Sequence, residues 1–346
     1  MSIKTTSPSF RVGIDKLTAV IHWLPDADGI ESNIKQIIAM LCSVHEVSPF
    51  QICTRQNGYA YSIVLPLSKK LDLKNKYNNQ GLPKLIVQVK PNAHTRPFIR
   101  FELTGFPLLR GDYFIARRWL ESIIGRMATL YLHPNKVKVT RIDIAHDFKM
   151  HMDEINVNFT HAMKSACFFG KDGKPETLYF AIDSVQKKLI VYSLKAKRKR
   201  DGKPDIDEYD TRAELRLQPK CFLSELPEKV TAHSYIDRIE FFDLSLFEDE
   251  KISTLEKNYI ALFGIKAALQ AMDKNHRRSF RLKLAKHKVQ YFDHDLIDKE
   301  LKKEFKRMRG LFSDYDCSHI ANHVQHKFDA IFQSYHVKSD KDFTVS

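Results

Sequence analysis

The spacing of apolar residues predicts a mainly strand-based first two thirds with a few helices. Several segments carry apolar residues at every second position, which is the period of a strand with one buried face. We expect strands at residues 10–23, 82–90, 96–105, 136–148, 176–182, 187–193 and 211–218. Helical periodicity instead predicts helices at residues 29–45 and 113–130, and a shorter one at residues 152–167.

The pattern changes near residue 248, where helical periodicity takes over. Residues 255–272, 296–308 and 318–334 each place apolar side chains on one helical face. We therefore expect a first domain at residues 1–247, a helical C-terminal region at residues 248–335 and a tail at residues 336–346. A hairpin turn is expected around Gln56-Asn57-Gly58, and a charged loop after residue 194.

Net charge indicates the kind of partner. The 346 residues include 56 Lys and Arg against 42 Asp and Glu, a net charge of +14. A surface this basic attracts polyanions, of which nucleic acid is the commonest inside cells. The five scattered cysteines have no metal-binding spacing and fit a reducing compartment. Without an apolar leader or spanning segment, we expect a protein of the bacterial cytoplasm that does not bind membranes.

A four-residue pattern of arginine, apolar residue, acid and apolar residue occurs four times. Its copies begin at Arg100, Arg141, Arg212 and Arg238. On a strand, alternate side chains share a face, so each arginine lies beside its own carboxylate. Neighbouring copies would gather oxygen ligands for a hard divalent cation and guanidinium groups for a phosphate. Cross-strand ion pairing on a solvated face is the alternative. The candidate metal ligands are Glu102, Asp143, Asp147 and Glu214.

Tyr192 is the candidate nucleophile, because it ends an apolar strand and precedes a cluster of cations. A tyrosine hydroxyl attacks poorly unless positive charge or a metal favours the phenolate. Packing with the hydroxyl at the surface is the alternative for a tyrosine at a strand end. The cations are Lys188, Lys195, Lys197, Arg198, Lys199, Arg200 and Lys203.

Two basic tracts are candidate DNA contacts. The first is Lys195 to Lys203, expected to be a loop that follows the phosphate backbone without reading sequence. The second contributes Arg277, Arg278 and Arg281, for which a charged, exposed helix face is the alternative. His319, His323 and His326 have helical spacing but no acid or cysteine partner, which favours surface or packing residues over a metal site.

The order of motifs resembles the replication initiation factor family of filamentous phages and small rolling-circle plasmids, including the transfer-type Rep proteins. The resemblance covers roughly residues 10–245 and is carried by RIDIAHDF, GKPETLYFA, LIVYSLKAKRKR and TRAELRL, with GIDKLTAVIHW as the opening strand. It implies an α+β fold of antiparallel sheets with packed helices, built from a duplicated unit. The repeated arginine-acid pattern agrees with such a duplication.

The resemblance also implies roles for individual residues. Tyr192 corresponds to the nucleophile, while Asp143 and Glu214 match the acidic positions near the metal, with Asp147 and Glu102 as further ligands. The chain departs from the family pattern at two places, where Ser193-Leu194-Lys195 and Ala181 stand for other residues. Tyr179 and Tyr209 are therefore reserve candidates. The chain has no pair of histidines separated by one apolar residue, so the nickases that use such a pair match poorly.

The resemblance implies a metal-assisted transesterification at a replication origin. Residues 1–247 would then be the catalytic domain, and the helical region at residues 248–335 would contact DNA or a partner. Tyr192 would attack the scissile phosphate, leaving a 5′-phosphotyrosine and a free 3′-OH primer, with Mg²⁺ or Mn²⁺ as cofactor and Arg141 and Arg212 neutralising charge. Expected partners are the double-stranded origin, the single-stranded nick site, a host helicase and polymerase, and a second copy of the chain. The alternatives are a non-catalytic origin-binding factor or repressor, and a tyrosine recombinase. A recombinase would carry its tyrosine on a helical domain, whereas Tyr192 ends an expected strand.

Overall fold

The protein forms two compact units in a computed structural model. The structure describes residues 10–22, 27–53, 58–67, 73, 82–92, 99–125, 128–160, 162–184, 186–202, 208–308 and 311. Unit 1 comprises Met1–Gly13, Asp143–Gln218 and Glu228–Leu301, and unit 2 comprises Ile14–Ile142, Pro219–Pro227 and Lys302–Ser346. The expected division into a catalytic domain and a C-terminal region concerns roles, which these units do not test.

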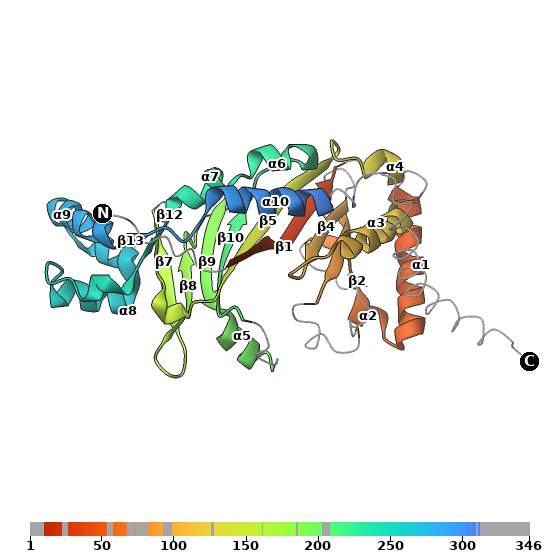
Figure 1. Cartoon of the computed structure of the whole chain (residues 1–346). Helices are drawn as coiled ribbons and strands as arrows, with labels where there is room; N and C mark the ends of the chain where they lie inside the picture. The colour runs from red at the N-terminus through yellow and green to blue at the C-terminus, as the bar shows by residue number, and fades with distance from the viewer. Residues whose placement is uncertain are drawn as a thin grey trace, which may run out of the picture. The chain divides into compact units, whose positions relative to one another are not determined.

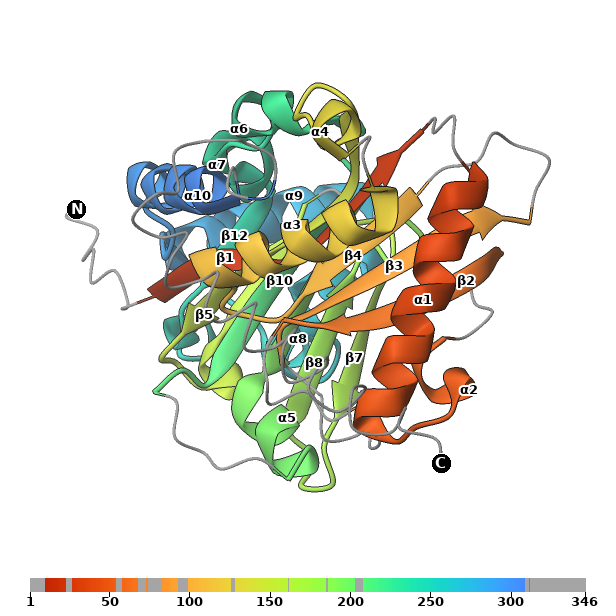
Figure 2. The same cartoon turned by 90° about the vertical axis from the view of Figure 1, so that its right-hand side faces the viewer.

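Unit 2 is an antiparallel sheet with two helices packed together. Its strand order is β2 (Tyr59–Pro66), β3 (Lys84–Pro91), β4 (Ile99–Thr104) and β1 (Phe10–Ile21). Figure 2 shows helices α1 (Ala27–His45) and α3 (Arg110–Ile124) together with these strands. Buried Trp119 of α3 donates a hydrogen bond of 2.9 Å to the carbonyl of Pro66 at the end of β2. Short elements complete this unit: α2 (Pro49–Ile52), α4 (Ala128–Tyr131), β11 (Cys221–Phe222) and η4 (Leu223–Glu225).

Unit 1 contains a second run of antiparallel strands, in the order β5-β10-β9-β8-β7, which Figure 1 shows in yellow and green. The bounds are β5 (Val137–Phe148), β7 (Ser165–Phe169), β8 (Pro175–Phe180), β9 (Lys187–Ser193) and β10 (Thr211–Leu217). A small sheet of β13 (Lys288–Val289), β12 (Ile239–Phe242) and β6 (Asn156–Phe159) belongs to the same unit.

Helices of the C-terminal region bury their own apolar cluster in unit 1. They are α8 (Thr254–Ala271) and α9 (Lys274–Leu284), followed by α10 (His294–Met308). Ser253 and Glu256 form a capping box at the start of α8, and Asp273 accepts from two backbone N–H groups at the start of α9. Phe280 and Leu284 of α9 pack with apolar residues of α8. Short elements precede these helices: η3 (Met152–Glu154), α6 (Leu226–Lys229), α7 (Ala232–Tyr235), η5 (Ile236–Arg238) and η6 (Leu244–Phe247).

The two units share a connectivity. In each, a first strand leads into an antiparallel meander whose last strand lies beside the first, β4 beside β1 and β10 beside β5. The pairing registers also correspond. The Gln88 row of unit 2 (Ser62, Gln88 and Arg100) matches the Tyr192 row of unit 1 (Thr177, Tyr192 and Arg212). This correspondence agrees with the expected duplicated unit.

The expected α+β class, with a large antiparallel sheet and C-terminal helices, is confirmed. No helix in the described part of the chain is long and apolar enough to cross a membrane. The expected elements on residues 56–57, 203 and 318–334, the histidines of that last segment and the tail at residues 336–346 lie outside the described residues.

The expected helix at residues 152–167 is wrong. The segment forms η3, β6 and the beginning of β7 instead. Buried Val157 and Phe159 alternate with polar neighbours, and β6 pairs with β12 far along the chain. Because this pairing partner is non-local, the competition between strand and helix was decided by tertiary contacts rather than local propensity.

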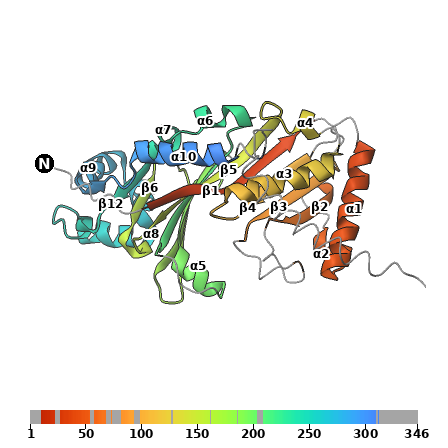
Figure 3. The same ribbon diagram turned by 45° about the vertical axis from the view of Figure 1, so that its right-hand side comes forward.

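The expected basic loop after residue 194 begins as a helix, α5 (Leu194–Arg200), which follows β9 and is the green helix labelled in Figure 3. Ser193 caps it by accepting a 3.0 Å hydrogen bond from the backbone N–H of Ala196. Four of its cations fall in the last turn, where positive charge interacts favourably with the negative end of the helix dipole: Lys197, Arg198, Lys199 and Arg200. The basic segment is therefore more ordered than its charge indicated.

Candidate active site

One face of unit 1 gathers the polar side chains that the sequence singled out. Tyr192 of β9 lies directly opposite Arg212 of β10 on one side and Thr177 of β8 on the other. Residues directly opposite each other in an antiparallel pair project from the same face. Glu214 is opposite Ile190, two residues before Tyr192, so it lies on this face as well. The arginine and the acid of the third copy thus both lie on β10, next to the strand that carries Tyr192.

Asp147 joins two arginines in a buried ion-pair network. Its carboxylate is fully buried and accepts hydrogen bonds from Arg212 at 2.6 and 3.1 Å and from Arg11 at 2.6 and 3.1 Å. Charge-assisted bonds of this kind fix the donor's geometry. Arg212 is thereby held next to Tyr192, and Asp147 acts on it as a positioning residue. A cation at Asp147 would compete with two guanidinium groups, so the cross-strand alternative fits this residue better.

The other expected metal ligands lie in different surroundings. Asp143 is fully buried, 3.6 Å from Arg216 in unit 1. Glu102 belongs to unit 2, where it accepts from Lys16 at 2.7 Å and Arg100 at 3.1 Å. Burial raises the pKa of Glu102, but the Lys16 hydrogen bond and the charges of Lys16, Arg100 and Arg141 outweigh it and hold the pKa below its ordinary value.

The fourth copy does not join this face. Its arginine, Arg238, lies in the short η5 helix rather than on a strand. Its acid, Glu240, lies on β12 of the small sheet and accepts from Asn158 at 2.7 Å and Lys288 at 3.3 Å. Arg141 is on the part of β5 that belongs to unit 2.

Tyr192 lines a pocket of about 210 Å³, the Tyr192 pocket. Glu214, Glu176 and Thr177 line the same pocket, together with Ser193 and residues of α5. The ammonium of Lys197 lies 4.9 Å from the centre of the Tyr192 ring, a cation–π geometry. The tyrosine is thus next to both carboxylates and an exposed basic helix.

The basic helix α5 starts two residues after Tyr192. Leu194 donates a backbone hydrogen bond of 2.7 Å to Asp210, and Arg198 donates to the carbonyl of Tyr209. These bonds hold α5 against the start of β10. Four cations remain exposed to solvent on it: Lys195, Lys197, Lys199 and Arg200.

The donor set of the Tyr192 pocket fits a hard divalent cation only in part. Mg²⁺ is commonly held by one or two carboxylates with water and a substrate phosphate. Glu214 and Glu176 supply two carboxylates at this pocket. Within the described ranges, the one group of three metal-ligating side chains whose atoms lie within 4.8 Å is elsewhere, at His233, Asp237 and His294. The four carboxylates expected from the repeated motif therefore do not gather into one cluster, and their metal role stays a prediction.

The structure adds residues that the sequence reasoning missed. Arg11 is paired with Asp147, and Glu176 lines the Tyr192 pocket. The signal for Glu176 was present, because it lies within GKPETLYFA on a strand of the same hairpin. The strand pattern at residues 10–23 could have placed Arg11 on a strand face. It could not have shown the partner, because Asp147 lies 136 positions away in the sequence.

The reserve tyrosines differ in their surroundings. Tyr179 also lines the Tyr192 pocket and forms an edge contact with Phe168, with ring centres 5.5 Å apart. Tyr209 lies outside the strands, and its ring faces the guanidinium of Arg11 at 4.6 Å and the ammonium of Lys149 at 5.9 Å.

The second basic tract lines a separate cavity of about 650 Å³, the α9 cavity. Arg277 and Arg281 of α9 line it with Lys266 and Lys288, whereas Arg278 is exposed outside it. Burial lowers the pKa of Lys266, and the charges of Arg281 and Arg277 lower it further. Arg277 also donates a 2.8 Å hydrogen bond to the carbonyl of Met272. This concentration of positive charge is suited to an anionic ligand.

Comparison with known proteins decides the family. The chain is 30% identical over 224 residues to a replication initiation protein of Staphylococcus aureus, covering 59% of this chain and 68% of that protein. The chain belongs to the replication initiation protein family. Two further replication initiation proteins of this organism are 31% and 30% identical over 80 residues, covering 23% of this chain and about a quarter of each relative. No model of a known protein family matches the chain.

Membership of the replication initiation protein family confirms the resemblance that the ordered motifs indicated. It also gives the polar face of unit 1 a context, since replication initiation acts on nucleic acid and this face combines a tyrosine, two carboxylates and a basic helix.

Proposed function

We propose that this replication initiation protein nicks one strand of a rolling-circle origin through Tyr192. The observation that carries the proposal is the Tyr192 pocket, where a tyrosine, two carboxylates and the basic helix α5 meet. A strand-end tyrosine that served packing alone would need none of these neighbours.

The reaction is a transesterification, in which one phosphate ester bond forms as another breaks. The phenolic oxygen of Tyr192 forms a bond to phosphorus while the bond between phosphorus and the 3′ oxygen breaks. The phenolic proton leaves to solvent, and the departing oxygen takes up one proton. The products are a 5′-phosphotyrosine and a free 3′-OH, which can prime a polymerase. Because the phosphodiester energy is conserved, the link can be reversed to reseal the strand.

Residues of unit 1 bind and orient the scissile strand. Lys197, whose ammonium lies over the Tyr192 ring, places positive charge beside the nucleophile, and the exposed cations of α5 bind the neighbouring backbone. Arg212, held by Asp147, keeps positive charge beside the tyrosine. Glu214 and Glu176 would hold Mg²⁺ or Mn²⁺, which when bound supplies positive charge at the phosphate.

The C-terminal region supplies a second DNA contact in this proposal. The α9 cavity and the exposed Arg278 offer cations for the phosphates of the origin duplex. A host helicase, a polymerase and a second copy of the chain remain candidate partners. The rival function is a non-catalytic origin-binding protein, which would use the same basic surfaces without a nucleophile.

The test is covalent capture of DNA by the full chain. Supercoiled plasmid carrying DNA from beside the gene, labelled internally, is incubated with protein and Mg²⁺ or Mn²⁺, then treated with SDS and nuclease. We expect labelled nucleotide on Tyr192, lost with EDTA and with Tyr192→Phe. Tyr179→Phe and Tyr209→Phe are matched controls that should keep the adduct.

Each other outcome is informative. An adduct that maps to Tyr179 or Tyr209 keeps the reaction and overturns the assigned nucleophile. Salt-sensitive DNA binding without a nick or an adduct, with either metal, overturns the enzyme and favours the origin-binding protein.

A further inference from the structure

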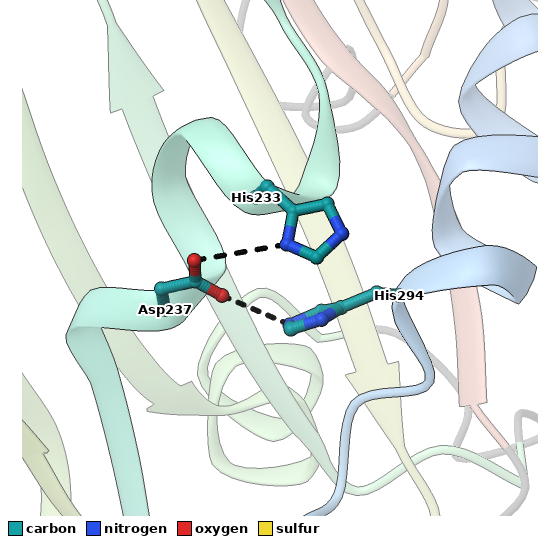
Figure 4. Close-up of side chains that lie close together, drawn as sticks. All are labelled: His233, Asp237 and His294. Atoms are coloured by element: carbon teal, nitrogen blue, oxygen red, sulfur yellow. Dashed lines mark ion pairs between the residues drawn. The ribbon is translucent and has the colours of Figure 1, made fainter.

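Two histidines and an aspartate converge on one point of unit 1, outside the Tyr192 pocket. His233 lies on α7, Asp237 follows on η5, and His294 is the first residue of α10. Figure 4 shows the Asp237 carboxylate beside both imidazole rings, with one oxygen toward each ring. One oxygen lies 3.7 Å from Nδ1 of His233, and the other lies 3.3 Å from Nε2 of His294. One ligand atom from each residue lies within 4.8 Å of the other two.

We propose that His233, Asp237 and His294 bind one transition-metal ion of the Zn²⁺ type. Zinc bonds to imidazole nitrogen and carboxylate oxygen are about 2.0–2.2 Å long, so atoms on one ion lie at most about 4 Å apart. The two measured separations of 3.7 and 3.3 Å fall within that limit. Imidazole suits Zn²⁺, Ni²⁺ and Cu²⁺ rather than Mg²⁺, which prefers oxygen. The three side chains leave a position for water or a further ligand.

The backbone that carries the ligands is held in place without the ion. Asp298, one turn after His294, accepts a 2.6 Å hydrogen bond from the backbone N–H of Ala232, the residue before His233. Tyr235, between the first two ligands, is 1% exposed, and Ile297 of α10 is fully buried. An ion therefore needs only side-chain rotation to complete its site, which lowers the entropy that binding costs.

The ligands are open to solvent, with side-chain exposures of 68% for His233, 53% for Asp237 and 25% for His294. An ion can enter from solution without any movement of the fold.

Simple ion pairing accounts for the arrangement less well. One carboxylate balances one imidazolium, but here two rings share it with their centres 4.6 Å apart. A metal ion accounts for the convergence of all three side chains, because it takes one donor atom from each of them. His151 and Asp210 show the ordinary case, one histidine 3.1 Å from one aspartate.

A bound ion would tie the first turn of α10 to the turn formed by α7 and η5. Its role is then to fix the beginning of this helix, and it shares no residue with the Tyr192 pocket. The inference rests on no part of the proposed nicking reaction.

The test is metal titration of the full chain after dialysis against EDTA. Isothermal calorimetry with Zn²⁺ should show one site per chain, and Mg²⁺ should give no signal there. His233→Ala and His294→Ala should each weaken Zn²⁺ binding by more than about tenfold, or about 1.4 kcal/mol. His151→Ala is the matched control and should bind Zn²⁺ like the parent. X-ray absorption of the Zn²⁺ form should show two imidazole ligands.

Thermal unfolding of each variant without metal is the control for folding. His233→Ala, at an exposed position, should leave the melting temperature unchanged. The proposal is overturned if the parent protein takes up no stoichiometric Zn²⁺. It is equally overturned if His233→Ala combined with His294→Ala retains the parent affinity, since the ion would then be held elsewhere in the chain.

Discussion

The two units share a pattern of strands but carry different side chains at matching positions. In the Gln88 row of unit 2, Gln88 donates a 3.3 Å hydrogen bond to Ser62 and accepts one from Arg100, and both Gln88 and Ser62 are buried. In the Tyr192 row of unit 1, the position of Gln88 is taken by Tyr192, which is also buried but lines the Tyr192 pocket. The row below also corresponds, because an isoleucine faces the acid in both, Ile86 opposite Glu102 and Ile190 opposite Glu214.

The difference shows that the primary role of the repeated arginine-acid motif is structural. In unit 2 the acid of the motif, Glu102, forms ion pairs with Arg100 of the same motif and with Lys16. In unit 1 the same motif supports a tyrosine, and the basic helix α5 follows directly on the tyrosine strand. Function in unit 1 would then rest on what was added to a shared scaffold rather than on the motif itself.

The largest expected effect comes from making the Tyr192 row resemble the Gln88 row. Tyr192→Gln removes the only oxygen assigned as nucleophile, so nicking should fall by at least about 10⁴-fold, a loss typical of a removed catalytic group. DNA binding at fixed salt should persist, because the cations of α5 are unchanged. Plasmid relaxation and filter binding measure the two. Nicking at the parent rate would show that Tyr192 is a packing residue, as Gln88 is.

Breaking an ion pair should lower the free energy of unfolding more in unit 1 than in unit 2. Asp147→Asn leaves Arg212 and Arg11 without their shared anion, and a broken buried pair costs about 3–5 kcal/mol. The side chain of Arg212 is 8% exposed. Glu102→Gln should cost less, about 1–2 kcal/mol, because its partners reach water more easily.

Lys16 and Arg100 are 22% and 24% exposed, which is the basis for that smaller effect. Urea unfolding of the two variants and the parent measures the difference. An equal or larger loss for Glu102→Gln would contradict the view that unit 1 holds the more deeply buried network.

Acid should affect the two units in different pH ranges. Burial lowers the pKa of His146 in unit 1 to about 4 from an ordinary 6.5. Between these values the unfolded chain holds the proton and the folded chain does not, so stability falls as the pH drops from 6.5 to about 4. The shift corresponds to up to about 3 kcal/mol.

In unit 2, hydrogen bonds from Lys90 and Tyr61 lower the pKa of Glu31 from 4.5 to about 2. The stability it contributes is present above pH 4.5 and lost as the pH falls to about 2.

Unfolding at a series of pH values measures these ranges. His146→Phe should flatten the dependence between pH 6.5 and 4, and Glu31→Gln should flatten it between pH 4.5 and 2. The aromatic neighbours of His146, Phe292 at 4.9 Å and Tyr235 at 5.9 Å, favour phenylalanine as the replacement. If His146→Phe leaves the upper range unchanged, another group carries it.

Local pattern was enough for much of the fold. The strands that contain Arg141, Tyr192 and Arg212 and the helices at 27–45 and 254–271 match the periodicities that predicted them. It failed at residues 152–167, where β6 finds its partner in β12, and it missed the helix that begins after Ser193. At residues 152–167 a distant strand outweighs local propensity. After Ser193 the run of charge indicated a loop, although Leu, Lys, Ala and Arg all favour helix and Ser193 caps it.

The sequence by itself determined the basic charge, the repeated motif, Tyr192 at a strand end and the family resemblance, because these depend on residue order alone. Only the tertiary structure decided which charges meet. Strand pairing brings Arg11 to Asp147 and Glu214 to the Tyr192 pocket, and it keeps Glu240 in another sheet. Chain folding likewise brings His294 to His233 and Asp237. Contacts between residues so far apart follow from packing of the whole unit, which no local pattern encodes.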